Sequence, residues 1–369
     1  MLAITLMLLP AAAVHAHSGE QPTTAGVAVL ESALAKPRPA GQYTGGSKTL
    51  QLHAAKNEVE SFLVVISGGS AGLAGVTVQV ASPMAGATVT VHAARYVNAS
   101  KPSGCTGAVG LWADPLVPAV DVYVGEKRNA FPLTIPSNEN RMVWVDLYVP
   151  KLASAGSSTH LVHVAGSDGF SSTLSYTLTV FDFALPTQPT LTSLFGHGAD
   201  WSSLVKAHRT TTDQETAALV KRYLKCGLMH RVSFSDFLGY GSPQMQRDAA
   251  GSINGSFSSF VSEWGEFIDG TALPFGPTPG RLSSVQAPHE LCSLSYNKHS
   301  KRFTNCTANA AREQVAYWAN LSHRFDSKGW LPLLFDYTVD EPSCSPGETA
   351  RRHCLMHCAC VWSVCSKVA

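Results

Sequence analysis

The β-type patterning of Gly26–Phe183 is the feature that most limits what this chain can fold into. Segments such as Val76–Val80, Thr88–Val91 and Leu174–Val180 alternate or run with β-branched and apolar residues, and clusters of Gly, Ser, Pro and Asn separate them at short intervals. Such segments are typical of half-buried strands, and no helical period competes over most of this stretch. We therefore predict an all-β, antiparallel sandwich, with Met142–Val149 as its strongest strand.

A different rhythm begins after Leu185–Pro189, where two prolines force extended backbone and suit an interdomain linker. Thr212–Cys226, capped by Thr212 and stopped by Gly227, and Ala308–Phe325 carry helical stripes, and the apolar run Leu331–Tyr337 follows as a strand. Alternating strands and helices predict a parallel sheet, with a (β/α) TIM-like barrel as the first candidate. The chain shows about three or four such units where a complete barrel has eight, so we predict a partial barrel.

The N-terminal residues indicate whether the protein enters the secretory pathway. The apolar run Leu2–Leu9 is too short to span a bilayer, and Val14-His15-Ala16 fits a signal-peptidase site after Ala16. No Lys or Arg precedes the run, so a buried N-terminal helix stays open as the alternative. We predict a signal peptide at 1–16, a β-sandwich domain at 17–186, the N-terminal part of a barrel domain at 187–342 and a Cys-rich tail at 343–369. The protein is then expected to be secreted into the extracellular space.

Composition excludes several classes of partner. Hydrophobic residues make up 45% of the chain and charged residues 14%, so two domains with buried cores are expected in 369 residues. The formal net charge is +1, with no sustained basic or acidic run. We therefore expect no nucleic-acid partner and no membrane insertion, while the composition leaves the oligomeric state open.

An acidic pair, Asp340-Glu341, follows the apolar strand Leu331–Tyr337. In barrels the loops after the strands form the active site, and two neighbouring carboxylates can divide acid–base work because proximity and burial separate their pKa values. The alternative is structural: Asp340 caps a following helix or turn, and Glu341 is solvated.

Five segments of the chain resemble the family 123 glycoside hydrolases and the related secreted proteins called DUF4091. They are Leu52–Phe62, Val120–Gly125, Met142–Pro150, Ser193–Gly196 and Tyr337–Pro342. The resemblance implies a β-sandwich followed by a barrel that acts on β-linked N-acetylgalactosamine by substrate-assisted retention. It further implies that Glu341 is the general acid/base and that Asp340 orients the acetamido group and stabilises the oxazolinium-like intermediate. No metal or organic cofactor is implied, and the expected partner is a carbohydrate substrate.

Other candidate substrate contacts come from aromatic residues and from the end of the first barrel strand. Trp201, Tyr240, Trp264 and Tyr337 could form a floor that stacks on a sugar ring, and a core role is the alternative for each. His197 and Asp200 lie where substrate contacts often originate, and a turn role is equally compatible with their position.

The resemblance ends at Pro342, whereas the family's barrel continues past its acidic pair. The tail carries Cys354, Cys358, Cys360 and Cys365 among histidines and shows no strand–helix rhythm. A translated intron or frameshift, a truncated isoform and a zinc site are three explanations, although the spacing matches no standard zinc finger. If the tail is genuine, the catalytic half-site is incomplete and the chain is expected to be inactive. A non-catalytic, secreted carbohydrate-binding or cell-surface protein therefore stays open as the alternative function.

Overall fold

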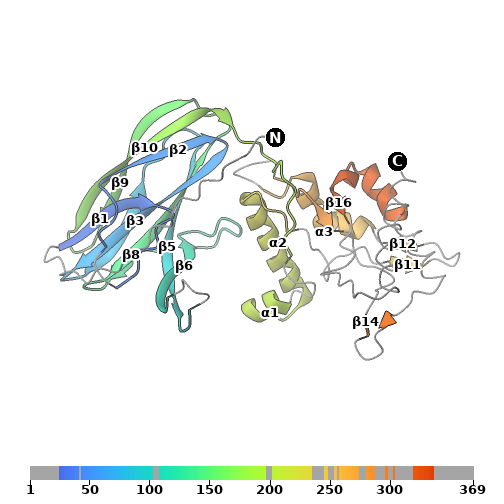
Figure 1. The fold of residues 1–369 in the computed structure, drawn as a ribbon, viewed down its shortest axis with the longest axis horizontal. Helices are drawn as coiled ribbons and strands as arrows, with labels where there is room; N and C mark the ends of the chain where they lie inside the picture. The colour runs from blue at the N-terminus through green and yellow to red at the C-terminus, as the bar shows by residue number, and fades with distance from the viewer. Residues whose placement is uncertain are drawn as a thin grey trace, which may run out of the picture. The chain divides into compact units, whose positions relative to one another are not determined.

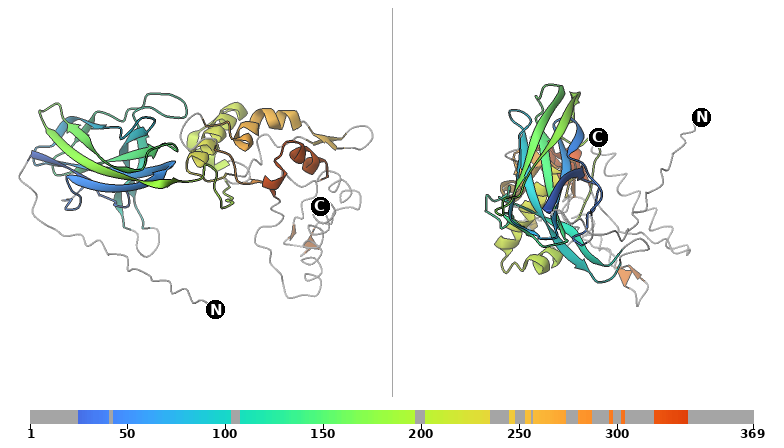
Figure 2. Two further views of the ribbon diagram at one scale, coloured as in Figure 1. Left: turned by 90° about the horizontal axis from the view of Figure 1, so that it is seen from above. Right: turned by 90° about the vertical axis from the view of Figure 1, so that its left-hand side faces the viewer.

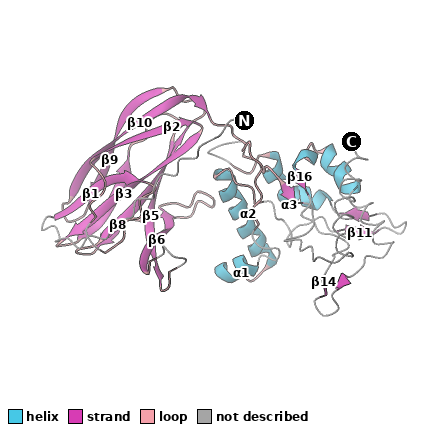
Figure 3. Cartoon of the chain, in the orientation of Figure 1, coloured by secondary structure: helices cyan, strands magenta, loops and turns pink. Residues whose placement is uncertain are grey.

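The computed structural model describes two compact units of the chain, Met1–Leu185 and Pro186–Ala369 (Figure 1). The described residues are 25–40, 43–102, 108–196, 202–234, 245–247, 253–255, 257–273, 280–286, 296–297, 302–303 and 319–335. Strands make up most of the described first unit, and helices are confined to the second (Figure 3).

Two five-stranded sheets form the described part of the first unit, one lying over the other (Figure 2). The first sheet has the order β1 (Ala25–Ser32), β3 (Glu58–Gly69), β8 (Asn140–Val149), β5 (Thr88–Ala99) and β6 (Gly110–Pro118). The second has the order β2 (Thr49–Lys56), β10 (Ser171–Ala184), β9 (Gly156–Ala165), β4 (Leu73–Val80) and β7 (Leu133–Ile135). The predicted β-sandwich arrangement is confirmed.

One strand pair departs from the predicted antiparallel pattern. β2 runs parallel to β10, with Leu52 opposite Leu178 and Ala54 opposite Val180. Asn57 alone separates β2 from β3, so these strands do not form a hairpin within one sheet, and β2 joins the second sheet instead. Asn57 takes a positive φ of 62°, a region that Asn tolerates better than most residues. Its side chain is buried, accepts from the Tyr148 hydroxyl at 2.9 Å and donates to the Leu185 carbonyl at 2.9 Å.

The sandwich core is made by alternate residues of both sheets. On β8, Val143, Val145 and Leu147 are fully buried and face the second sheet, where Tyr176 and Leu178 are also fully buried. Each large apolar side chain buried in this way contributes about 1.5–3 kcal/mol. The sequence of β8 is apolar on its other face as well, because Met142 is buried there in a second, smaller cluster with Leu63, Val65 and Ala94.

The described part of the second unit contains α1 (Ser202–His208), α2 (Asp213–Met229), α3 (Phe257–Asp269) and a helical segment at 319–327. Its short strands are β11 (Met245–Arg247), β12 (Ile253–Gly255), β13 (Val285–Gln286), β14 (Tyr296–Asn297), β15 (Arg302–Phe303) and β16 (Leu334–Phe335), and a 3-10 turn, η1, spans Leu331–Leu333. None of the helices in this described part is long and apolar enough to cross a membrane.

Helix α2 begins as predicted and ends later than predicted. Thr212 caps it through a capping box, in which its side chain accepts from the Glu215 amide at 3.2 Å and Glu215 Oε2 accepts from the Thr212 amide at 3.2 Å. Gly227 does not stop the helix, which runs on to Met229. A Cβ on Gly227 would lie 2.5 Å from the Phe234 ring, so this glycine allows a close approach of the following strand.

Aromatic residues dominate the core of the second unit. Trp264 on α3 is fully buried and packs against Phe267, whereas Trp330 packs against Phe325 and donates its indole N–H to Asp269 Oδ1 at 2.6 Å. A closed barrel is not confirmed: among the described residues, the parallel contacts of this unit are one β-bridge between Phe195 and Phe234 and the two-stranded pair β13–β16.

Candidate functional site

The predicted site residues lie outside the described part of the chain. Asp340, Glu341 and Tyr337 follow the last described strand in sequence, and His197 and Trp201 follow the first short parallel segment, which ends at Phe195. The roles predicted for these five residues therefore stay predictions. The short parallel segments that precede them in sequence are described.

Parallel contacts join these strands in two pairs. Phe195 forms a parallel bridge with Phe234, and its amide donates to the Ser233 carbonyl at 3.0 Å. β13 pairs in parallel with β16, with Val285 opposite Leu334 and Gln286 opposite Phe335. The two chains of a parallel pair leave the sheet at the same edge. In an open α/β sheet or a barrel, this carboxyl edge is where catalytic residues collect.

A network of serines connects the strands near their amino ends. The Ser193 amide donates to Ser283 Oγ at 3.0 Å, the Ser233 amide to Ser193 Oγ at 3.0 Å, and the Ser283 amide to Ser233 Oγ at 2.7 Å. The hydroxyls of Ser233 and Ser283 are 2.9 Å apart, and the Ser284 hydroxyl donates to the Ser193 carbonyl at 2.7 Å. The three strand starts are thus held together by side chains as well as by backbone. This network was not foreseen, because single serines before short apolar runs carry no distinctive signal.

The structure distinguishes a core role from a sugar-binding role for one of the four aromatic candidates. Trp264 is fully buried in the helix-side core of the second unit, so its role there is structural. Tyr240 and Asp200 lie outside the described residues, as do the cysteines and histidines of the tail. Within the described ranges, no three His, Cys, Asp or Glu side chains gather closely enough to hold a metal ion.

A second polar constellation, which the sequence did not reveal, lies on the outer face of the first sheet. Asp146 Oδ1 accepts from the Ser61 hydroxyl and from the Trp144 indole N–H, both at 2.6 Å, and Asp146 Oδ2 lies 3.9 Å from His92 Nδ1. Burial lowers the pKa of His92, and the neighbouring Asp146 carboxylate opposes that shift. The Ser61 hydroxyl donates to the carboxylate and not to the imidazole, so the arrangement does not activate a serine nucleophile. These residues are far apart in the sequence, and they are neighbours because of the register in which β3, β8 and β5 pair.

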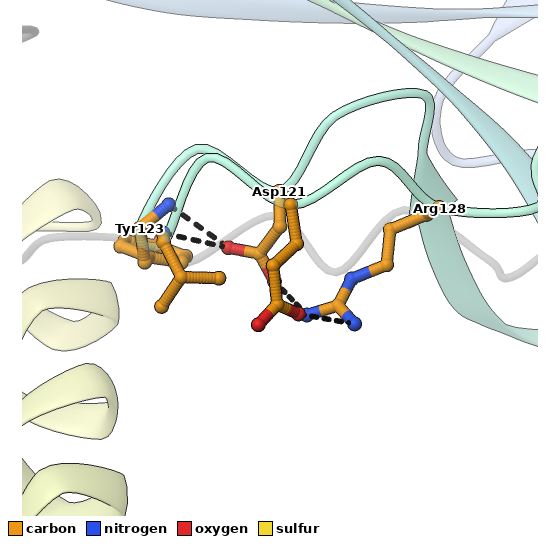
Figure 4. Close-up of polar contacts among 5 residues, drawn as sticks. Asp121, Tyr123 and Arg128 are labelled. Atoms are coloured by element: carbon orange, nitrogen blue, oxygen red, sulfur yellow. Dashed lines mark hydrogen bonds and ion pairs between the residues drawn. The ribbon is translucent and has the colours of Figure 1, made fainter.

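A third cluster shapes the loop at Asp121–Arg128 (Figure 4). Asp121 Oδ1 accepts from the amides of Tyr123 at 2.9 Å and Val124 at 3.3 Å, and Asp121 Oδ2 accepts from Arg128 at 2.8 Å. Arg128 also pairs with Glu126 at 2.9 Å. Burial alone would raise the pKa of Asp121, but the hydrogen bonds from Arg128, Tyr123 and Val124 together lower it. Because both carboxylate oxygens of Asp121 accept hydrogen bonds from within the loop, the cluster fixes the conformation of this segment.

Comparison with solved structures includes a match over most of the chain. The family 123 glycoside hydrolase from Clostridium perfringens, described for glycolipid glycan hydrolysis, superposes with a TM-score of 0.51 at 13% identity, over 90% of this chain and 60% of that one. The chain therefore shares a fold with about 60% of the length of that hydrolase. Shorter likenesses include a PapD-like domain of human CEP192 (TM-score 0.22, 7% identity, 46% of this chain and 96% of that one). The N-terminal domain of PorA is similar at a TM-score of 0.22 and 8% identity, over 43% of this chain and all (100%) of that one. No family model and no curated protein matches the sequence.

Proposed function

We propose that this chain is a glycoside hydrolase-like protein of the family 123 type, directed at β-linked N-acetylhexosamine and, in particular, at N-acetylgalactosamine glycosides. The observation that carries the proposal is the fold shared with a family 123 hydrolase over 90% of the chain. The parallel strand β16 supports it further, because Asp340 and Glu341 follow that strand in the sequence.

In the proposed mechanism the substrate supplies its own nucleophile. The oxygen of the 2-acetamido group attacks the anomeric carbon while Glu341 protonates the leaving oxygen, which gives an oxazolinium-like intermediate and a free alcohol. Asp340 orients the acetamido N–H and stabilises the positive charge that develops on the ring. Glu341, now ionised, then takes a proton from water as the water attacks the anomeric carbon, and the configuration is retained. Tyr337, Trp201 and His197 are the proposed contacts to the sugar.

The test compares two substrates that differ only at carbon 2. The full chain is assayed with the 4-nitrophenyl β-glycosides of N-acetylgalactosamine and of galactose, which lacks the acetamido group. Hydrolysis of the first and not of the second is expected, because galactose offers no internal nucleophile. Asp340→Asn is expected to lower kcat by about 10²-fold or more, in line with the loss of one transition-state contact. Asp326→Asn, an exposed carboxylate of the same unit, serves as the matched control and is expected to leave kcat unchanged.

Equal hydrolysis of both glycosides would overturn the substrate-assisted mechanism. An intact, folded chain that hydrolyses neither would overturn the enzymatic function and favour the non-catalytic alternative. We also propose that the protein is secreted, on the strength of the N-terminal apolar run and the small residues around Ala16.

A further inference from the structure

The outer face of the second sheet in the first unit carries rows of hydroxyl-bearing residues, which are interspersed with the exposed side chains of Gln51, His53, Gln79, Leu161 and His163. On β10, inward positions such as Tyr176 and Leu178 are buried in the core, and the outward positions from 173 to 179 are Thr, Ser, Thr and Thr. Across the strand boundary, Thr179 pairs with Ser157 at 2.7 Å and Thr177 with Thr159 at 2.9 Å, hydroxyl to hydroxyl. Outward residues repeat about every 6.8 Å along a strand, and strands lie about 4.8 Å apart, so these groups form a lattice.

These hydroxyl pairs keep hydrogen-bonding capacity for a ligand. A hydroxyl offers one donor and two acceptor sites, and a pair uses one donor and one acceptor between its members. Each pair therefore retains one O–H donor and further lone pairs that face away from the core. Thr159 and Ser157 are exposed, so this capacity is presented to solvent.

Three aromatic side chains, those of His53, Phe181 and Phe183, lie in a row at one end of the same face. The rings of Phe181 and Phe183 are nearly parallel, 6° apart, with centroids separated by 5.9 Å, and His53 on β2 lies 6.0 Å from Phe181. Phe181 is 43% exposed and Phe183 56% exposed, so both rings present apolar surface to solvent. Lys56 and Asp182 flank this end and form an ion pair at 2.6 Å, so they neutralise each other.

The face carries no Lys, Arg, Asp or Glu at the outward positions of the described strands β2, β10, β9, β4 and β7. As a design guideline, a soluble surface carries charged residues at about 25–35% of its positions. The outer face of the first sheet, by contrast, holds the carboxylates of Glu31 and Asp146. We call the outward residues of β2, β10, β9, β4 and β7, together with Phe181 and Phe183, the neutral face.

The chemistry of the neutral face selects among partners. It offers no cations to a nucleic acid or an anionic membrane. Leu161 on the central strand β9 is 44% exposed, but its partner on β10 is Ser175 and the next outward residue of β9 is His163. The face therefore lacks the broad apolar centre of a stable protein interface. A neutral polyhydroxylated polymer can cover it without removing ions from water, and exposed aromatic rings can pack against the C–H faces of sugars.

We propose that the neutral face is a binding site for a neutral polysaccharide, which forms hydrogen bonds with the Ser/Thr rows and stacks a sugar ring on Phe183. The site lies wholly within the first unit and holds none of the proposed catalytic residues. It would localise the protein on a glycan whether or not the chain hydrolyses it.

The test is affinity electrophoresis of the full chain in gels that contain hydroxyethylcellulose, galactomannan or glycol chitin, with alginate as the anionic comparison. Retardation is expected in at least one neutral gel and not in alginate. The double variant Phe181→Ala/Phe183→Ala is expected to weaken the apparent affinity about tenfold or more, as truncation of aromatic anchors commonly does. Thr159→Lys, which places a charge within the face, is expected to weaken it to a similar extent.

Thr88→Lys is the matched control, because Thr88 is an exposed threonine on β5 of the first sheet. It is expected to keep the affinity of the unchanged chain, and circular dichroism confirms that each variant is folded. Absence of retardation in all three neutral gels would overturn the proposal, as would equal losses in Thr159→Lys and Thr88→Lys or equal retardation in alginate. Retention without hydrolysis of N-acetylgalactosaminides would sustain this inference and remove the proposed enzymatic function.

Discussion

Replacing Ser233 with alanine tests whether the short strands of the second unit are held together as the structure shows. Ser233 is 1% exposed, and its hydroxyl oxygen accepts from the Ser283 amide at 2.7 Å and lies 2.9 Å from the Ser283 hydroxyl. Alanine leaves the Ser283 amide without this partner, which costs about 1–3 kcal/mol, and removes a hydroxyl pair worth about 1 kcal/mol. The expected loss in the free energy of unfolding of the second unit is therefore about 3 kcal/mol.

Hydrogen exchange with mass spectrometry measures this loss where it occurs, because tryptophan fluorescence would add signals from both units. A loss of about 3 kcal/mol corresponds to roughly hundredfold faster exchange of the amides in the peptides that contain Ser193 and Ser283. Peptides from β8 and β10 of the first unit are expected to keep their exchange rates. Ser258→Ala, at an exposed position on α3, is the control and is expected to change stability by less than about 0.5 kcal/mol.

The double variant Ser233→Ala/Ser283→Ala separates the pair from its surroundings. Because each hydroxyl is a partner of the other, the two single losses are expected to exceed the double loss by about 1 kcal/mol or more. If Ser233→Ala exchanges no faster than Ser258→Ala, or if the two single losses are additive, the serine network does not hold the strands and the reasoning fails.

Three further predictions concern other parts of the chain. The pKa of His92 is lowered from 6.5 by burial, so the unfolded chain binds the proton more readily than the folded chain. The contribution of His92 to the stability of the first unit is therefore fully present above pH 6.5 and is lost as the pH falls below it. His92→Phe is expected to flatten this dependence in urea midpoints measured between pH 5 and 7.5, and an unchanged slope would contradict it. Thr212→Ala removes the N-cap of α2 and is expected to cost about 1 kcal/mol, read as faster amide exchange in the first turn of α2. Expression in a eukaryotic secretory host is expected to release a protein that begins at His17, and N-terminal sequencing of retained, uncleaved protein would refute the predicted signal peptide.

The sandwich could be predicted because its strands carry their own signal. Alternation in Leu174–Val180 matches inward positions that are buried in the structure, and the two-sided apolar pattern of Met142–Val149 matches a central strand. The parallel pairing of β2 with β10 could not be predicted, because it depends on a one-residue connection at Asn57 and on long-range contacts. The prediction that Gly227 ends helix α2 failed for a related reason. A glycine that is needed for the close approach of the Phe234 ring cannot be told, from sequence alone, from a glycine that ends a helix.

The site was harder to predict than the fold. Ser61, Asp146 and His92 lie on three different strands. No spacing pattern in the sequence indicates that their side chains are in contact. The neutral face is visible only once β10 is flanked by β2 and β9, since Ser/Thr alternation within one strand reflects ordinary strand preference. Asp340 and Glu341 were proposed from adjacent acids after an apolar run and from the resemblance to family 123, and their roles stay predictions. The run before them was predicted as one strand, Leu331–Tyr337, but Leu331–Leu333 form a 3-10 turn and only Leu334–Phe335 are a described strand.

The most direct test of the proposed hydrolase is the effect of Glu341→Gln on two substrates that need acid catalysis to different degrees. A disaccharide with N-acetylgalactosamine β-linked to a second sugar has a poor leaving group, whereas 4-nitrophenol leaves without protonation. We predict that kcat/KM for the disaccharide falls about 10²–10⁴-fold and that the value for the nitrophenyl glycoside falls far less, with Glu263→Gln unchanged on both. Equal losses on the two substrates, or no hydrolysis of either by the intact chain, would contradict the account.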